Sequence, residues 1–204
     1  MRGRFFVIEG IDGSGKSTVA KRLAETLALR GRRVLRTREP GGTPLGEKVR
    51  RLLLDTRNTD LTPLAELFLY MASRAQLVEE VIRPALRHGI DVVCDRYYYS
   101  TAAYQGAAGG VGPHHVLDIA ERIAGFEKPD LILLLDLPPG TARRRKESVP
   151  RDRMELKGQA YQNRVRRGFL ALARRDPRRF RIIDAARPFD RVFEDLWEAV
   201  RRAL

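Results

Sequence analysis

The segment Gly10-Ile11-Asp12-Gly13-Ser14-Gly15-Lys16-Ser17-Thr18 constrains this chain more than any other. It has the spacing G-x-x-x-x-G-K-S and stands between an apolar run at 4–9 and a helical pattern at 17–29. Glycines let successive backbone N–H groups surround phosphate oxygens, and the N-terminus of the following helix attracts negative charge. Lys16 would reach the β- and γ-phosphates, and Ser17 would ligate Mg²⁺. The sequence therefore predicts a phosphate-binding loop for a nucleotide.

Short apolar runs alternate with longer helical patterns along the chain. The expected strands are 4–9, 33–37, 90–95, 131–137 and 180–184, and helical spacing marks 64–87, 116–123 and 189–203. Such alternation predicts an α/β fold in three layers, α/β/α, around a five-stranded parallel sheet. Ligands gather beyond the carboxyl ends of such strands. The polar residues that follow three of them, from Gly10, Arg38 and Asp95 onward, are expected to share one site.

Composition bounds the remaining possibilities. The 204 residues suit a single domain over 1–204, with the polar, proline-interrupted stretch at about 143–153 as a small lid. No apolar run approaches the roughly 20 residues that span a bilayer, so a cytoplasmic location is expected. Cys94 is the one cysteine, which excludes an intrachain disulfide. A net charge of +13 favours anionic partners, from small phosphates to nucleic acid or an acidic membrane surface, without choosing among them.

Four motifs together carry a resemblance to a known family. Besides the phosphate-binding loop they are Thr37-Arg38-Glu39-Pro40-Gly41-Gly42-Thr43, Asp95-Arg96-Tyr97 and Ser100-Thr101-Ala102-Ala103-Tyr104-Gln105-Gly106. In order and spacing the chain resembles the thymidylate kinases of the P-loop NTPase fold over nearly its whole length. The resemblance implies transfer of phosphate from ATP, with Mg²⁺, to dTMP in dTTP biosynthesis. It also implies a homodimer, with no nucleic acid or membrane as partner.

The acceptor phosphate needs positive charge without a metal, and arginine supplies it bidentately. By resemblance, Arg38 and Arg96 hold that phosphate beside the donor γ-phosphate, and Asp12 lies near the acceptor sugar and phosphate. Asp95 ends a strand as an acid that holds Mg²⁺ through water would, together with Ser17. Asp136 ends the next strand and is the competing candidate for the metal.

Thymine recognition needs a flat apolar face and a few groups that bind the edge of the base. The resemblance puts Tyr70 where the family stacks an aromatic ring, usually phenylalanine, on thymine. Arg74 follows one helical turn later and would bind a base carbonyl or support the phosphate. Thr101 and Gln105 would contact the polar edge of the base, and Tyr104 would pack against the deoxyribose, leaving little room for a 2′-hydroxyl.

An arginine placed over the transferring group accelerates phosphoryl transfer by about 10³ to 10⁵ in related systems. Some members of the family carry it directly after the loop aspartate, where this chain has Gly13, so the lid is expected to supply it. Arg153 is the first choice, then Arg151, with Arg143 assisting. The catalytic residues expected by resemblance are thus Lys16, Arg96, Arg153, Arg151 and Asp12. Nucleotide contacts are expected from Gly10, Ile11, Asp12, Gly13, Ser14, Gly15, Lys16, Ser17, Thr18, Arg143 and the backbone at Ala185.

Two other functions remain open from the residues. A deoxynucleoside kinase would share the fold and the donor chemistry but would need a base for an uncharged hydroxyl. A basic nucleic-acid-binding protein would explain the charge, although no recognition motif for nucleic acid occurs. The Asn-Lys-x-Asp signature for guanine is absent from the sequence, which disfavours a GTPase.

Overall fold

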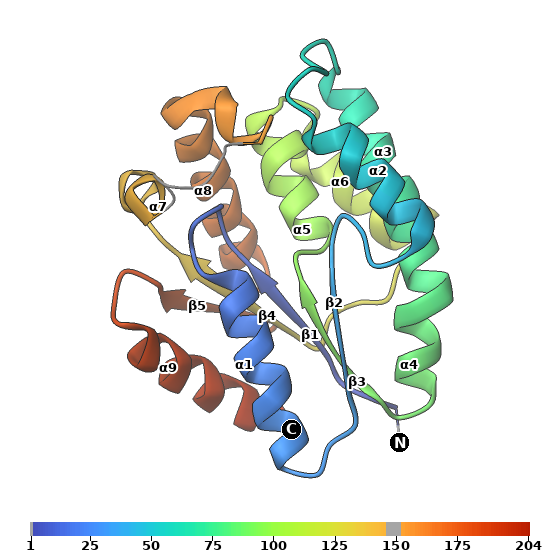
Figure 1. Ribbon diagram of the computed structural model, residues 1–204, viewed down its shortest axis with the longest axis vertical. Coiled ribbons are helices and arrows are strands. Elements are labelled where there is room, and N and C mark those ends of the chain that lie inside the picture. The colour runs from blue at the N-terminus through green and yellow to red at the C-terminus, as the bar shows by residue number, and fades with distance from the viewer. Residues whose placement is uncertain (1, 146–151) are drawn as a thin grey trace.

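Five parallel strands form the central sheet of the computed structural model, which describes residues 2–145 and 152–204 (Figure 1). Their order is β2-β3-β1-β4-β5. The strands are β1 (Phe5–Glu9), β2 (Val34–Arg38), β3 (Asp91–Asp95), β4 (Leu131–Asp136) and β5 (Phe180–Asp184). All five expected strands are confirmed, with ends that differ by one residue at most. Residues Phe5 to Ile8 are fully buried, because β1 has a strand on each side and helices on both faces.

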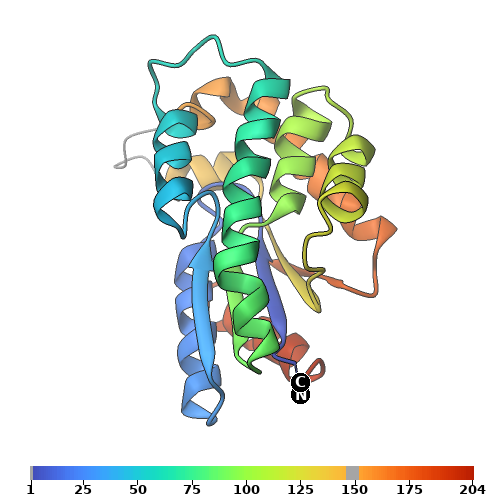
Figure 2. The same cartoon turned by 90° about the vertical axis from the view of Figure 1, so that its right-hand side faces the viewer.

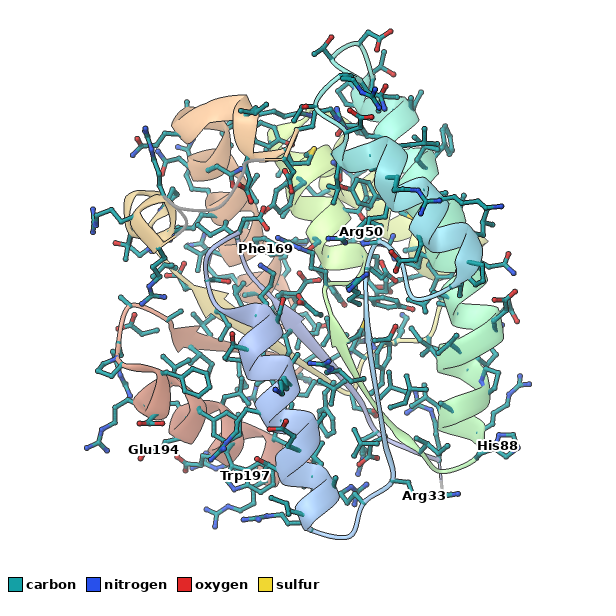
Figure 3. All side chains as sticks on the ribbon, in the orientation of Figure 1. Arg33, Arg50, His88, Phe169, Glu194 and Trp197 are labelled. Atoms are coloured by element: carbon teal, nitrogen blue, oxygen red, sulfur yellow. The ribbon has the colours of Figure 1, made fainter. Side chains whose placement is uncertain are left out.

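Helices cover both faces of the sheet, which confirms the three-layer prediction. On one face lie α1 (Lys16–Leu29) and α9 (Phe189–Arg201), and Arg30 stacks on Trp197 between them at 4.5 Å from the ring centroid (Figure 3). The right-handed crossovers of a parallel sheet place the connections β2–β3, β3–β4 and β4–β5 on the opposite face. They contain α2 (Pro44–Leu54), α3 (Pro63–Leu77), η1 (Val78–Ile82), α4 (Arg83–Arg87), α5 (Tyr98–Thr101), η2 (Ala102–Ala108), α6 (Pro113–Asp118), η3 (Ile119–Ile123), α7 (Pro139–Arg145), η4 (Glu155–Lys157) and α8 (Gly158–Arg175).

The helix expected at 64–87 runs without a break as α3, the π-helical turn η1 and α4 (Figure 2). Its start follows from local chemistry: Thr62 caps the helix by accepting from the N–H of Ala65 at 3.2 Å, and Pro63 occupies the first turn, where a missing N–H costs nothing. Thr43 and Pro44 begin α2 in the same way. The two helices lie side by side over the carboxyl end of the sheet.

The structure describes the beginning and the end of the expected lid at about 143–153. Arg143 and Arg145 belong to the last turn of α7, where cations stabilise the helix C-terminus. The middle of the expected lid, with Arg151, lies outside the described residues. Arg153 at its end is only 6% exposed, so it is a buried side chain and not part of a solvated loop.

The strand register aligns the residues that end each strand. Ile8 of β1 and Arg38 of β2 both pair with Asp95 of β3, and Asp136 of β4 pairs with Asp184 of β5. The loops that follow β1 and β3 therefore leave the sheet at the same edge, the one formed by the carboxyl ends of the strands. This edge carries the candidate site.

Candidate active site

The phosphate-binding loop joins β1 to α1 as expected, and α1 begins at Lys16. Gly13 has φ 81°, and a Cβ built there would lie 2.6 Å from the carbonyl oxygen of Ala142 in α7. A side chain at position 13 would thus meet both a strained backbone and the backbone of α7. The loop cannot carry an arginine at this position without displacing that helix.

Lys16 is buried, and its Nζ donates to the carbonyl oxygen of Ile11 at 2.8 Å. Burial lowers the pKa of Lys16 to about 8, and the nearby Arg96 guanidinium adds to that effect. A phosphate group bound at the loop would raise this pKa, because it would add negative charge beside the ammonium.

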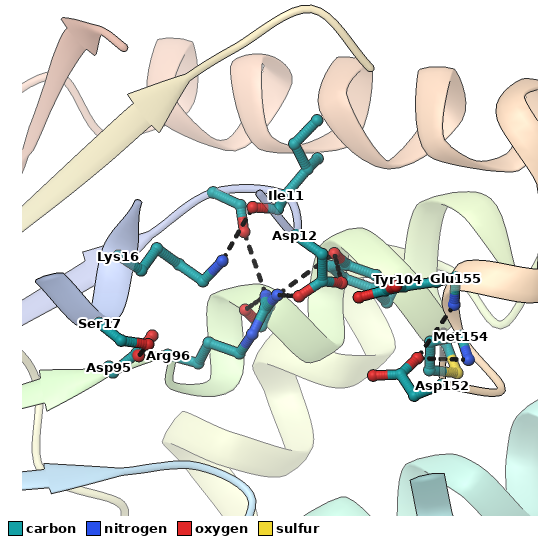
Figure 4. A network of polar contacts seen from close by, with 12 residues as sticks. Ile11, Asp12, Lys16, Ser17, Asp95, Arg96, Tyr104, Asp152, Met154 and Glu155 are labelled. Carbon is teal, nitrogen blue, oxygen red and sulfur yellow. Dashed lines mark hydrogen bonds and ion pairs between the residues drawn. The ribbon is translucent and has the colours of Figure 1, made fainter. Parts of the chain in front are cut away.

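Ser17 and Asp95 lie together below the loop (Figure 4). The Ser17 hydroxyl donates to Asp95 Oδ2 at 2.5 Å, and Asp95 Oδ1 is buried without a hydrogen-bond partner among the described residues. By contrast, both carboxylate oxygens of Asp136 accept from Arg166, at 2.6 and 2.8 Å. The described residues hold no cluster of three or more His, Cys, Asp or Glu. A hydroxyl beside one acid with an orphaned oxygen nevertheless fits Mg²⁺, which takes few protein ligands and keeps water and phosphate in its shell.

Arg96 is central to the polar network of the site. Its backbone φ of 72° is the left-handed conformation that an arginine rarely adopts. The guanidinium contacts Asp12 Oδ1 at 2.6 Å, the Gly10 carbonyl at 3.1 Å and the Ser100 hydroxyl at 3.0 Å. Tyr104 donates to the other oxygen of Asp12 at 3.1 Å, so Asp12 lies between Arg96 and Tyr104 (Figure 4).

Glu9 is a site residue that the sequence reasoning missed. It is fully buried and accepts from the N–H of Tyr97 at 2.9 Å, and from the N–H and hydroxyl of Ser100 at 3.1 and 2.5 Å. These bonds hold the turn that contains the strained Arg96. Burial raises the pKa of Glu9 to about 7. The available signal is a carboxylate at the end of a buried strand, but Glu9 stands one residue before the loop and has the position of an ordinary strand residue.

A cavity of about 70 Å³ opens beside this network. Seven of the eight residues expected to bind the acceptor line it: Asp12, Tyr70, Arg74, Arg96, Thr101, Tyr104 and Gln105. They come from the loop, α3, the turn after β3, α5 and η2. Segments that are far apart in the sequence therefore line the same cavity. Other lining residues, among them Glu39, Arg50, Leu54 and Met154, were not expected.

Arg74 lies at the bottom of the cavity with 1% exposure. It forms an ion pair with Glu39 at 2.5 Å, and it donates to the Thr101 hydroxyl at 3.0 Å. Burial raises the pKa of Glu39 to about 6, against the opposing effect of Arg74. These partners fix the orientation of the guanidinium.

Arg38 does not line the cavity that contains Arg96. Its Nη2 donates to both carboxylate oxygens of Glu47, at 3.1 and 3.2 Å, and it faces a groove shared with Ser17 and Asp95. Arg50 takes the corresponding place in the cavity lining, reaching from α2 over the carboxyl end of the sheet (Figure 3). Burial lowers the pKa of Arg50, and Arg38 adds to this effect. In sequence, Arg50 looks like any arginine of an amphipathic helix, so no pattern distinguished it.

Arg153 does not contact the phosphate-binding loop. Its Nε donates to the Leu53 carbonyl at 2.9 Å and its Nη1 to Glu66 Oε1 at 2.5 Å. Arg143 lines a second cavity with Ile11 and Asp12, next to the loop. Ala185 is buried directly after β5, and its N–H donates to the Asp136 carbonyl at 2.9 Å.

Comparison with known proteins identifies the family to which this chain belongs. The model described as "Thymidylate kinase" matches residues 8–196. The chain belongs to the thymidylate kinase family. The thymidylate kinase of Nitratidesulfovibrio vulgaris is 46% identical over 208 residues, which cover 98% of this chain and 97% of that protein. That of Deinococcus radiodurans is also 46% identical, over 98% and 97% of the two chains, and that of Desulforudis audaxviator is 45% identical over 100% and 93%.

Membership of the thymidylate kinase family confirms the resemblance seen in the four motifs. The matched region runs from within β1 to within α9, so it covers the cavity and all of the sheet except the first three residues of β1. Across 2–145 and 152–204, no helix has the length and apolar character to cross a membrane.

Proposed function

We propose that this chain transfers the γ-phosphoryl group of ATP to dTMP, giving dTDP and ADP, in the biosynthesis of dTTP. The observation that carries this proposal is the cavity in which Arg96, Asp12 and Arg74 lie next to a complete phosphate-binding loop. A dianionic acceptor phosphate fits a pocket that contains three arginines, Arg50 included. Family membership supports the same reaction.

The donor would bind with its phosphates on the backbone of 10–18 and on Lys16, which would exchange the Ile11 carbonyl for phosphate oxygens. Ser17 would ligate Mg²⁺ directly, and Asp95 would hold it through water, using the oxygen that lacks a partner. When bound, the metal neutralises charge between the β- and γ-phosphates. Arg143 and the backbone at Ala185 would border the nucleotide.

The acceptor would occupy the cavity with its phosphate on Arg96 and, after a side-chain rearrangement, Arg38. Tyr70 would stack on the base, and Arg74, Thr101 and Gln105 would bind its edge, as all four line the cavity. Tyr104, tied to Asp12, would pack against the sugar. An acceptor phosphate oxygen then attacks the γ-phosphorus in line. The bond from that phosphorus to the bridging oxygen breaks, and ADP leaves with the electron pair.

We retain one domain over 1–204 with a lid at about 143–153 as part of this proposal. Closing the lid would exclude water and so prevent hydrolysis of ATP. For Arg153 to serve as the catalytic arginine, it would have to leave Glu66 and the Leu53 carbonyl. Arg151 is the next candidate, and Arg143 already lies by the loop.

A coupled assay with a panel of nucleoside monophosphates tests the reaction, and dTMP should be the best acceptor. Preference for dCMP or AMP would contradict it. Thymidine turnover above dTMP turnover would favour a deoxynucleoside kinase, and tight DNA binding at physiological salt would favour the nucleic-acid-binding alternative.

Substituting Arg153→Ala tests the lid. If Arg153 reaches the transition state, turnover should fall by about 10² or more while ATP and dTMP binding persist. Arg143→Ala is the matched comparison, since that side chain is exposed and already beside the loop. Full turnover in Arg153→Ala would mean that Arg153 only forms the ion pair with Glu66. Arg151→Ala would then be the next variant to test.

A homodimer is also proposed. Four large apolar side chains on α2 and α3 are 44–57% exposed: Leu45, Leu52, Leu64 and Phe68. Covering them with a second copy would remove apolar surface from water. Light scattering should give twice the monomer mass, and a monomer would contradict the proposal.

A further inference from the structure

Glu66 of α3 is a buried carboxylate that joins three segments of the chain. It is 1% exposed, and its Oε1 accepts from Arg153 at 2.5 Å and from Lys157 at 2.8 Å. Its Oε2 accepts from the Nε2 of Gln105 at 2.9 Å. No residue of this cluster belongs to the phosphate-binding loop. The carboxylate therefore has some function other than contact with the phosphates.

The ionisation state of Glu66 determines which end of the Gln105 amide faces it. Although burial acts to raise the pKa of Glu66, hydrogen bonds from Lys157, Gln105 and Arg153 hold that pKa below its ordinary value. An ionised carboxylate only accepts hydrogen bonds. The NH₂ end of the Gln105 amide must then point at Glu66, and the carbonyl oxygen is the end that remains for a ligand.

Gln105 lines the acceptor cavity together with Arg74 and Tyr70. A thymine ring presents an N–H donor at N3 between two carbonyl oxygens, whereas cytosine presents an acceptor at N3 and an amino group beside it. An amide oxygen matches the N3–H of thymine, and an amide NH₂ would match the N3 of cytosine. The orientation of one amide thus distinguishes the two bases.

Arg74 supports the same choice from the adjacent wall. Its guanidinium can only donate, and Glu39 and Thr101 hold it in place. It suits a carbonyl oxygen and rejects an amino group. Arg74 and Gln105 therefore favour the same base only while the amide oxygen of Gln105 faces the ligand.

We propose that Glu66 is a positioning residue for base selection, because it holds the Gln105 amide with its oxygen toward the acceptor and so favours a base with an N–H at that point. This inference rests on the proposed function, since it concerns how the same cavity selects dTMP. Arg153 and Lys157 are the counter-charges that keep Glu66 ionised. Arg153, at the end of the expected lid, and Lys157, just after it, thereby support recognition of the base.

The test substitutes Glu66→Gln, because a glutamine at 66 can donate as well as accept and no longer dictates the orientation of Gln105. The ratio of kcat/KM for dTMP to that for dCMP should fall by about tenfold or more, mainly through a higher KM for dTMP. Glu79→Gln is the matched control: it makes the same substitution in the same continuous helix, at an exposed side chain that pairs with Arg83 and does not line the cavity, so the ratio should stay within about twofold of the wild-type value.

An unchanged ratio in Glu66→Gln, or an equal fall in Glu79→Gln, would overturn the inference. If the wild-type protein prefers another monophosphate to dTMP, the proposed function itself fails, so the two failures are distinct.

A second measurement needs only the wild-type protein, so it tests the inference even if the Glu66→Gln variant does not fold. In ¹⁵N NMR spectra, the Gln105 side-chain NH₂ should exchange with solvent more slowly than that of the exposed Gln159 and show a nuclear Overhauser effect to Glu66. The absence of this nuclear Overhauser effect would overturn the inference.

Discussion

Asp95 and Asp136 each end a buried strand, and in sequence they are equivalent candidates for holding a metal. Their partners differ in the structure. Arg166 of α8 occupies both oxygens of Asp136, whereas Asp95 contacts only the Ser17 hydroxyl through one oxygen and buries the other without a partner among the described residues. An ion pair already satisfies Asp136, so Asp95 is the acid that gains most from a cation.

Asp95→Asn should raise the Mg²⁺ concentration needed for half-maximal activity by about tenfold or more, since a neutral amide holds metal-bound water less well. Titration of activity with Mg²⁺ at saturating substrates measures the effect. Asp136→Asn is the control: it should weaken the pair with Arg166 at a cost of at most about 1 kcal/mol in stability and leave the Mg²⁺ dependence unchanged. The reverse pattern would assign the metal to Asp136.

At the scale of elements, the phosphate-binding loop depends on the helix that follows β4. The carbonyl of Ala142 in α7 lies where a side chain at Gly13 would be, although the two residues are far apart in the sequence. No local pattern in the sequence indicates this contact.

Gly13→Ala should destabilise the protein by about 2 to 4 kcal/mol, from left-handed backbone strain plus the contact with α7. Gly15→Ala should cost only about 1 to 2 kcal/mol, because Gly15 has a similar φ of 92° but nothing within 4 Å of an added Cβ. Urea unfolding of the two variants without ligand gives the free energy of unfolding of each. The difference between them separates the contribution of backbone strain from that of the contact with α7. Equal destabilisation would show that α7 yields to the added methyl group.

In the molecule as a whole, three glutamates are buried around the site. Glu9, Glu39 and Glu66 are each at most 4% exposed, and each is held by donors from other elements. Burying a charge costs free energy unless hydrogen bonds and counter-charges offset it. The fold accepts this cost where it orients Arg96, Arg74 and Gln105.

Glu9 makes the stability of the molecule depend on pH. Burial raises its pKa from 4.5 to about 7, with Lys16, Cys94 and Arg96 as the charged or titratable groups near it. The folded state therefore binds a proton that the unfolded state has lost. The stability contributed by Glu9 is fully present below about pH 4.5 and is lost as pH rises through about 7.

The free energy of unfolding of the wild-type protein, relative to that of Glu9→Gln, should fall by about 2 to 3 kcal/mol between pH 5 and pH 8. Urea unfolding at four pH values measures the difference. Glu25→Gln, which removes an exposed carboxylate of α1, should show no such trend. A difference that does not vary with pH would mean that Glu9 is ionised throughout.

Sequence patterns alone predicted the class of fold, the five strands, the phosphate-binding loop and seven of the residues that line the cavity. These depend on local patterns: buried strands, glycine spacing and motifs at strand ends. Only the tertiary structure decided which charged side chains are already paired. It placed Arg38 with Glu47 and Arg153 with Glu66, and it brought Arg50 and Glu9 to the site. The physical reason is that an ion pair depends on a distance between segments far apart in the chain, which no local pattern records.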